Sequence, residues 1–395
     1  MTAISDRTIN LLVRDRTRFG VGAIDDLAAV VREIGGGPDA RAFIVSDPGV
    51  VASGVTATVA GILAQDGMET AVFGEVEPNP GMGVVERGGA ELRAFGLDDV
   101  IIVAVGGGST MDTAKVLSLY ATNDVGVAEL GYENEELAPG RPLVAVPTTA
   151  GTGAETNIYG VITDEATGRK TYVGHRSVMP RACILDPELT LGLPPAATAA
   201  TGIDALTHSL ESLLSRNPNP FAEAIALGVV RTVSEWLPRA VADGSDIEAR
   251  SQLLVASHLA GLGQASGTGV GLVHALGHAI GARGRLPHGT ALAAVLPEVL
   301  AFDIDVRARE LALVGIALGV AAPSDRPATA ARAAVAAVLA LIRSVDQRRT
   351  LRELGIDNAL IPVIGRDALA DPAINNTPRM PTPDDVAAIL ATVAG

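Results

Sequence analysis

The chain has 395 residues, of which 48% are hydrophobic and 19% are charged, so it is too long for one compact core and is expected to form two domains. Its 30 Lys and Arg residues against 45 Asp and Glu residues give a formal net charge of −15. Such a surface repels phosphate backbones and anionic lipids, which argues against nucleic-acid and membrane partners.

The N-terminal residues M-T-A-I-S-D-R-T lack the basic and apolar stretches of a signal peptide. The apolar stretch from Leu311 to Ala322 stops at Pro323 and is too short to cross a bilayer. The single cysteine, Cys183, lies in a predicted buried strand and fits a reducing compartment. We therefore expect a soluble, cytoplasmic protein.

Strand and helix patterns alternate along the first half of the chain. This alternation predicts a parallel sheet covered by helices on both faces. A helix is expected from about residue 51 to 65, and another from the loop at Gly81 to about Phe95. The predicted strands are Ala40–Ser46, Thr70–Phe73, Asp99–Val105, Leu143–Val146 and Ala182–Leu185, with a β-hairpin formed by Ile158–Thr163 and Lys170–Val173.

A glycine run follows the most apolar of these strands. Gly106, Gly107 and Gly108 let the backbone turn tightly, and Ser109 is expected to cap the next helix. Free amides and the helix dipole then suit a pyrophosphate. Because the run is not G-x-G-x-x-G, a tight turn without a ligand is the alternative.

Further residues fit a dinucleotide. Asp47, just past the first predicted strand, is placed to bind a ribose 2′-hydroxyl and repel a 2′-phosphate, which favours NAD(H) over NADP(H); alternatively it only starts a turn before Pro48. The segment P-T-T-A-G-T-G-A-E-T offers the hydroxyls of Thr148, Thr149 and Thr152 to a flat ring, or is an ordinary surface loop. Lys170 either reaches the cofactor ribose or is a solvated edge-strand charge.

From Leu193-Pro194-Pro195 onward nearly every segment has a helical period. This change predicts an α/β, Rossmann-like NAD-binding domain over residues 1–192 and an all-helical domain over residues 193–395.

The helical half contains a cluster of potential metal ligands. Asp204 and His208 are four residues apart, as are His274 and His278, so each pair would lie on one helix face, and His288 follows. Three or more imidazoles with one carboxylate suit Fe(II), Zn(II), Co(II), Ni(II) or Mn(II). Spacing alone leaves open which of the five donors bind. His175 and His258 lie outside the pattern and are interpreted as ordinary structural histidines.

In this order, G-G-G-S, P-T-T-A-G-T-G-A-E, T-G-I-D-A-L-T-H, H-A-L-G-H and L-P-H-G resemble the motifs of the iron-containing, or group III, alcohol dehydrogenases. The resemblance covers nearly the whole chain. It implies an NAD(P)-binding α/β domain, a helical metal domain and an active site in the cleft between them.

The resemblance also implies a role for each motif residue. The implied metal ligands are Asp204, His208, His274 and His288. His278 is then a non-ligating histidine that relays the substrate proton. The implied cofactor-binding residues are Asp47, Gly107, Gly108, Ser109, Thr148, Thr149, Thr152 and Lys170.

The expected function is a reversible hydride transfer between a small primary alcohol or hydroxy acid and NAD, with a divalent metal polarising the substrate oxygen. Fe²⁺ is the expected metal and Zn²⁺ the alternative. A homo-oligomer is also expected. Other readings are a maleylacetate reductase, a 4-hydroxybutyrate dehydrogenase, a dehydroquinate synthase-like lyase, or a non-catalytic protein that binds NAD and metal. Maleylacetate reductases commonly lack part of the metal-ligand set, so the complete set here argues against that reading. A dehydroquinate synthase would use a Glu-His-His metal set, which the pattern here does not match.

Overall fold

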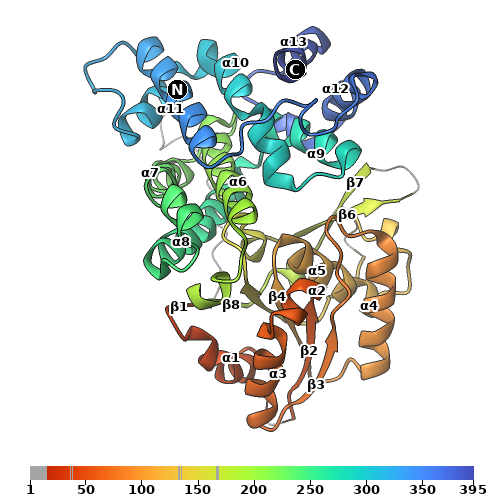
Figure 1. Cartoon of the computed structure of the whole chain (residues 1–395). Helices are drawn as coiled ribbons and strands as arrows, with labels where there is room; N and C mark the ends of the chain where they lie inside the picture. The colour runs from red at the N-terminus through yellow and green to blue at the C-terminus, as the bar shows by residue number, and fades with distance from the viewer. Residues whose placement is uncertain (1–15, 36, 38, 132–133, 135, 166–168) are drawn as a thin grey trace. The chain divides into compact units, whose positions relative to one another are not determined.

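The computed structural model describes residues 16–395 except 36, 38, 132–133, 135 and 166–168 (Figure 1). The chain divides into two compact units. One, the sheet unit, comprises the described part of Arg14–Pro194 together with Gly244–Val255. The other, the helical unit, comprises Pro195–Asp243 and Ala256–Gly395.

The sheet unit is built on a six-stranded sheet in the order β1-β8-β5-β4-β2-β3, and every pairing is parallel. All residues of β4 and β5 are buried, because helices cover both faces of the sheet. The strands are β1 (Arg16–Phe19), β2 (Arg41–Ser46), β3 (Glu69–Phe73), β4 (Val100–Gly106), β5 (Leu143–Pro147) and β8 (Ala182–Leu185). The parallel sheet and its five predicted strands are confirmed.

Strand β1 was not predicted. Its sequence, R-T-R-F, contains no apolar run and is exposed along its whole length, because it lies at the edge of the sheet beside β8. The antiparallel hairpin of β6 (Tyr159–Asp164) and β7 (Arg169–Gly174) matches the prediction.

Two apolar cores fill the two faces of the sheet. One contains Phe43 and Leu117, and the other contains Leu27 and Leu63. The helix expected over residues 51–65 is two helices, because Gly54 adopts φ 86° between them. The helices of this unit are α1 (Leu27–Glu33), α2 (Pro48–Ala52), α3 (Val55–Gln65), α4 (Met82–Phe95) and α5 (Gly108–Thr122), with short 3-10 helices η2 (Ala23–Asp26), η3 (Val127–Glu129), η4 (Ala154–Thr156), η5 (Arg176–Val178) and η6 (Pro187–Thr190).

The helical unit contains no strand among its described residues. Its helices are α6 (Pro195–Leu214), α7 (Pro220–Ala242), α8 (Ile247–Gly263), α9 (Leu272–Gly284), α10 (His288–Ala317), α11 (Pro327–Ser344), α12 (Ile361–Leu369) and α13 (Pro383–Val393), with the π-helix η7 (Gln264–Thr268) and the 3-10 helices η8 (Asn358–Leu360) and η9 (Pro372–Asn376). Helix α8 is shared, since its first half belongs to the sheet unit.

A close approach of α10 to α6 positions the metal-site candidates. A Cβ atom at Gly289 would lie 1.9 Å from the carbonyl oxygen of Ala200. Only glycine therefore allows the start of α10 to approach the α6 backbone so closely. This contact brings His288, the first residue of α10, beside the face of α6 that carries Asp204.

Among the described helices, α11 alone has the length and composition that could cross a membrane. Its buried residues include Ala330, Ala334 and Val338, and it packs against α10. Arg332 and Arg343 are exposed. This two-sided pattern is typical of a helix at the edge of a globular core.

Candidate metal and cofactor sites

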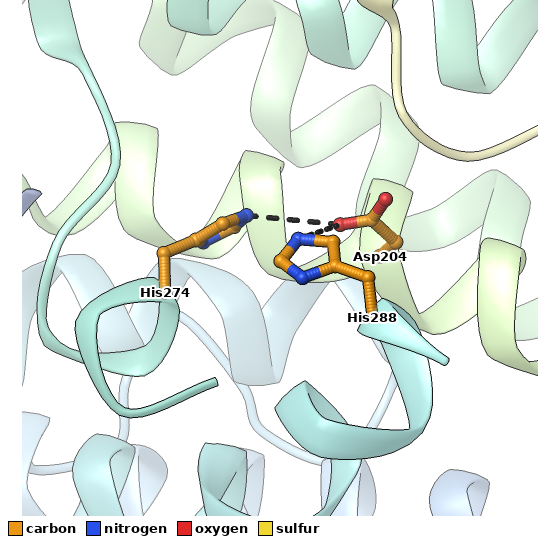
Figure 2. Close-up of side chains that lie close together, drawn as sticks. All are labelled: Asp204, His274 and His288. Carbon is orange, nitrogen blue, oxygen red and sulfur yellow. Dashed lines mark ion pairs between the residues drawn. The ribbon is translucent and has the colours of Figure 1, made fainter. Parts of the chain in front are cut away.

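Three helices bring four of the candidate ligands together. Asp204 and His208 lie one turn apart on α6, His274 is in the first turn of α9, and His288 begins α10. Oδ1 of Asp204 is 3.7 Å from Nε2 of His208, 3.7 Å from Nε2 of His274 and 3.6 Å from Nε2 of His288. Figure 2 shows the rings of His274 and His288 directed at the Asp204 carboxylate.

The geometry of Asp204, His274 and His288 fits a divalent metal, and His208 adjoins them, with its Nε2 lying 3.1 Å from Nε2 of His274. Oδ1 of Asp204 is buried and has no hydrogen-bond partner among the described residues. The separations of 3.6 to 3.7 Å are too long for hydrogen bonds. They are close to those expected for ligands about 2.1 Å from one tetrahedral ion, which lie about 3.4 Å apart. A buried, unpartnered carboxylate oxygen facing three imidazole nitrogens is costly unless a cation lies between them.

The charges of the cluster are strongly coupled. Burial raises the pKa of Asp204, but the charges of His208 and His288 outweigh burial and hold this pKa below its ordinary range. Burial lowers the pKa of His274, whereas the charge of Glu211 and the contact with Asp204 raise it to about 9. Burial and the neighbouring imidazoles lower the pKa of His288 well below its ordinary value.

Glu211, which was not predicted, orients His274. Its Oε2 lies 2.5 Å from Nδ1 of His274, and its Oε1 accepts a hydrogen bond from the amide of Val273 at 2.7 Å. A carboxylate on Nδ1 fixes the ring so that Nε2 faces Asp204. The sequence contains a signal for this role, because D-A-L-T-H-S-L-E places Glu211 on the same face of α6 as Asp204 and His208.

His278 is one turn beyond His274 on α9. Its ring stacks on that of His288, with 5.3 Å between centroids, but its Nδ1 lies 2.8 Å from Oδ2 of Asp371. The structure thus places the fifth candidate beside the four-donor cluster and pairs it with a carboxylate. Asp371 is 93 residues away in the chain, and no motif in the sequence marks it.

In the sheet unit, the glycine run forms the expected junction between strand and helix. β4 ends at Gly106, Gly107 is the N-cap, and α5 begins at Gly108. The prediction that Ser109 caps α5 is wrong: Ser109 lies in the first turn, and no described side chain caps the helix. The amides of this turn remain available to an anion.

The threonine loop packs directly on this helix terminus. A Cβ atom at Gly108 would lie 2.7 Å from Cγ2 of Thr152, and one at Gly107 would lie 3.2 Å from Cγ2 of Thr149. The amide of Thr148 donates to the carbonyl of Gly106 at 3.0 Å. A side chain at Gly108 would therefore displace Thr152, and one at Gly107 would crowd Thr149.

Asp47 caps a helix and lines a pocket. Its Oδ1 accepts hydrogen bonds from the amides of Gly49 and Val50, each at 3.0 Å, and so caps α2. Its Oδ2 accepts a hydrogen bond from the Thr110 hydroxyl at 3.3 Å. The same residue lines a pocket of about 870 Å³ at the carboxyl edge of the sheet. Glu77 and Glu188 also line it.

The pocket brings most of the predicted cofactor residues together. Among the described residues that line it there is no lysine or arginine, so its lining carries only negative charge. Of the predicted residues, it is lined by Asp47, Gly107, Gly108, Ser109, Thr148 and Thr149. Thr152 instead packs on Gly108, and Lys170 also lies outside the lining.

Lys170 is half-buried and makes a side-chain hydrogen bond. Its Nζ donates a hydrogen bond to Oδ1 of Asn79 at 2.8 Å. Burial lowers the pKa of Lys170, and the nearby carboxylate of Asp112 partly opposes this effect. The contact ties the β6–β7 hairpin to the loop that carries Glu77, one of the pocket residues.

A second lysine, which was not predicted, anchors the segment after the threonine loop. Lys115 on α5 is fully buried. Its Nζ donates to the carbonyl oxygens of Ala154 and Tyr159, each at 2.6 Å, and to Oδ1 of Asn157 at 2.9 Å. Lys115 thereby fixes the path of residues 154–159 over α5.

The pKa shift of Asp303, a buried carboxylate influenced by Glu211, predicts a pH-dependent stability. Burial and the charge of Glu211 raise the pKa of Asp303 from 3.8 to about 7, although Arg379 and Arg307 oppose this. The folded protein therefore keeps a proton that the unfolded chain releases, and stability is lost as pH rises from about 4 through 7.

We expect Asp303→Asn to remove this loss and to stabilise the metal-free protein at pH 8 by up to about 4 kcal/mol relative to wild type. Urea unfolding at pH 5 and pH 8 measures the difference; equal pH slopes for both proteins would contradict it.

Two protein-family models match this chain. The profile described as "Iron-containing alcohol dehydrogenase" matches residues 15–187. The profile described as "Fe-containing alcohol dehydrogenase family, C-terminal" matches residues 198–394. Together the two matches cover nearly the whole chain.

Individual proteins resemble the chain over most of its length. The probable alcohol dehydrogenase EutG of Salmonella typhimurium is 38% identical over 93% of this chain and 90% of its own length. The NAD-dependent methanol dehydrogenase of Bacillus methanolicus is 32% identical over 96% of this chain and 98% of its own. The crystal structure of a 1,3-propanediol oxidoreductase superposes with a TM-score of 0.93 at 33% identity, covering 98% of this chain and 100% of that one. A sulfoacetaldehyde reductase from Bifidobacterium kashiwanohense, solved with NAD⁺, gives a TM-score of 0.85 at 26% identity, covering 98% of each chain.

Proposed function

Because this chain belongs to the iron-containing alcohol dehydrogenase family and is an oxidoreductase of alcohols or aldehydes, we propose that it oxidises a small primary alcohol with NAD⁺ and catalyses the reverse reduction of the aldehyde. The observation that carries this proposal is the buried Oδ1 of Asp204, which faces three imidazole nitrogens and has no hydrogen-bond partner among the described residues.

The metal would be held by Asp204, His208, His274 and His288. A divalent ion there supplies Lewis acidity, which lowers the pKa of a substrate hydroxyl or polarises a carbonyl. The residues of the chain keep the donors in place. Glu211 holds His274, and the contact of Gly289 with α6 holds His288 beside Asp204. The expected metal is Fe²⁺, as in the family name, with Zn²⁺ as the alternative.

The cofactor would be NAD, which accepts the hydride from the alcohol carbon. Its pyrophosphate would bind to the amides at Gly107, Gly108 and Ser109, where no described side chain caps α5. Thr148, Thr149 and Thr152 would lie on the nicotinamide side, and Lys170 would contact a ribose. The carboxylates of Asp47, Glu77 and Glu188 line the pocket without a cation among its described lining residues, and they disfavour the extra phosphate of NADP.

The substrate proton requires a separate acceptor. When the alcohol is oxidised, its C–H hydride goes to the nicotinamide and its O–H proton must leave. His278 lies beside His288 and would accept this proton at Nε2, because its Nδ1 is already paired with Asp371.

Three further predictions accompany this function: the domain division, the location and the oligomeric state. The division into a cofactor domain (residues 1–192) and a metal domain (residues 193–395) remains a proposal, as does a cytoplasmic homo-oligomer. A 4-hydroxybutyrate dehydrogenase would share both proposed sites and differ only in substrate, whereas the complete ligand set argues against a maleylacetate-type reductase.

The direct test is the NADH absorbance change with a panel of alcohols and aldehydes after loading with Fe²⁺ or Zn²⁺. We expect turnover with NAD and at least 10-fold less with NADP. In Asp47→Asn the amide can still cap α2, but the negative charge is lost, so the NAD/NADP ratio of kcat/KM should fall by about 10-fold. An unchanged ratio would limit Asp47 to its capping role. Absence of turnover with every substrate and both metals would overturn the proposed function.

A further inference from the structure

The partner of His278 is itself held rigidly. Oδ2 of Asp371 lies 2.8 Å from Nδ1 of His278, and its Oδ1 accepts a hydrogen bond from the amide of Ala373 at 2.8 Å, which caps η9. The side chains of His278 and Asp371 are only 12% and 10% exposed. Both carboxylate oxygens are therefore engaged, and the carboxylate cannot rotate without losing one contact.

Hydrogen bonds hold the chain segments before and after Asp371 against α9 and against the backbone of Val270 and Arg216. Before it, Asp367 accepts two hydrogen bonds from the guanidinium of Arg283 on α9, at 2.8 and 2.6 Å. After it, the side-chain amide of Asn376 donates to the carbonyl of Val270 at 3.1 Å, and the carbonyl of Asn376 accepts from the amide of Arg216 at 3.0 Å. These contacts set the distance between Asp371 and the helix that carries His278.

The carboxylate determines which nitrogen of His278 carries a proton. Burial raises the pKa of Asp371, but the hydrogen bond and charge of His278 and the amide of Ala373 outweigh burial and lower it. An ionised carboxylate can only accept hydrogen bonds, so Nδ1 of His278 must be the donor. Neutral His278 then has its lone pair on Nε2.

We propose that Asp371 is a positioning residue for the proposed reaction, which holds His278 as its Nδ1–H tautomer and aims Nε2 at the substrate proton. This inference rests on the proposed function. Asp371 touches neither the substrate nor the metal in this scheme, and it acts only through His278.

Asp371→Asn separates this role from simple capping. The introduced amide can still accept from Ala373, but its N–H₂ group would donate to Nδ1 of His278 and move the proton to Nε2. A ring with its proton on Nε2 cannot accept one there. We therefore expect kcat for alcohol oxidation to fall by 10- to 100-fold, with KM for NAD⁺ and metal content unchanged. Asp371→Ala should lower kcat no more than Asp371→Asn does, although Asp371→Ala also removes the cap of η9.

Asp357→Asn is the matched control. Asp357 is exposed and caps η8 through the amide of Ala359 at 2.8 Å, and it has no role in the proposed sites. This variant should retain wild-type kcat. If Asp371→Asn also stays within two-fold of wild type while Asp371→Ala is impaired, Asp371 is a helix cap and the inference is wrong.

A His278→Gln variant distinguishes failure of the inference from failure of the proposed proton route. A large loss of kcat in His278→Gln with a normal Asp371→Asn protein overturns only the role of Asp371. Wild-type kcat in both variants overturns the proton route of the proposed function, and the inference with it. If the inference holds, Asp371→Asn costs little further activity in the His278→Gln background, because both changes remove the same function.

Discussion

His288→Ala should yield a folded protein that retains less than a tenth of the wild-type metal and loses about 1,000-fold in kcat/KM. His288 is the first residue of α10 and its side chain is 34% exposed, so its removal disturbs packing less than removal of a core side chain. It supplies one of the three nitrogens around Oδ1 of Asp204. Loss of Lewis-acid stabilisation of several kcal/mol corresponds to about three orders of magnitude in rate.

Metal analysis and the fluorescence of bound NADH measure the two effects separately. NADH should still bind, because no candidate metal ligand lines the proposed cofactor pocket of the sheet unit. His175→Ala is the control, since His175 accepts a hydrogen bond from the Ser177 amide and lies outside the cluster. Glu211→Gln should give an intermediate result, with metal affinity reduced 10- to 100-fold. Full turnover of metal-free His288→Ala would contradict the assigned metal site.

Lys115→Met should lower the free energy of unfolding of the sheet unit by about 3 to 5 kcal/mol. The substitution leaves the carbonyls of Ala154 and Tyr159 and the side chain of Asn157 without their ammonium donor. Asp112, whose carboxylate is 3.9 Å from Nζ, also loses a neighbouring positive charge. NADH affinity should fall with stability, because the anchored segment follows the threonine loop that packs on Gly107 and Gly108.

The choice of lysine at this position can be tested as well. Only two of the 30 basic residues in the chain are lysines, Lys115 and Lys170. A compact ammonium can donate to three acceptors around one point, whereas a planar guanidinium cannot fit the same buried space. Lys115→Arg should therefore be nearly as destabilising as Lys115→Met, and Lys170→Met should cost less. Urea unfolding of the four proteins gives the comparison, and a wild-type midpoint for Lys115→Arg would contradict the argument.

The sequence by itself determined the main features of this protein. Buried parallel strands are continuous apolar runs, so β2, β3, β4, β5 and β8 were recognisable without long-range information. The spacing of Asp204 and His208 on one helix face, and of His274 and His278 on another, is likewise a local property. Motif order was enough to indicate the iron-containing alcohol dehydrogenase family, which the family profiles confirm. Edge strand β1 was missed because exposed residues leave no apolar pattern.

Only the tertiary structure decided which groups meet across the chain. Asp371 reaches His278 over 93 residues, and Lys115 reaches Tyr159 over 44. Neither contact has a sequence period, because each depends on how separate elements pack. Ser109 was predicted to cap α5, but Gly107 takes the N-cap position and leaves the first turn without a side-chain cap. Packing also explains Gly289: the residue after His288 must be glycine because the backbone of α6 occupies the space of any larger side chain.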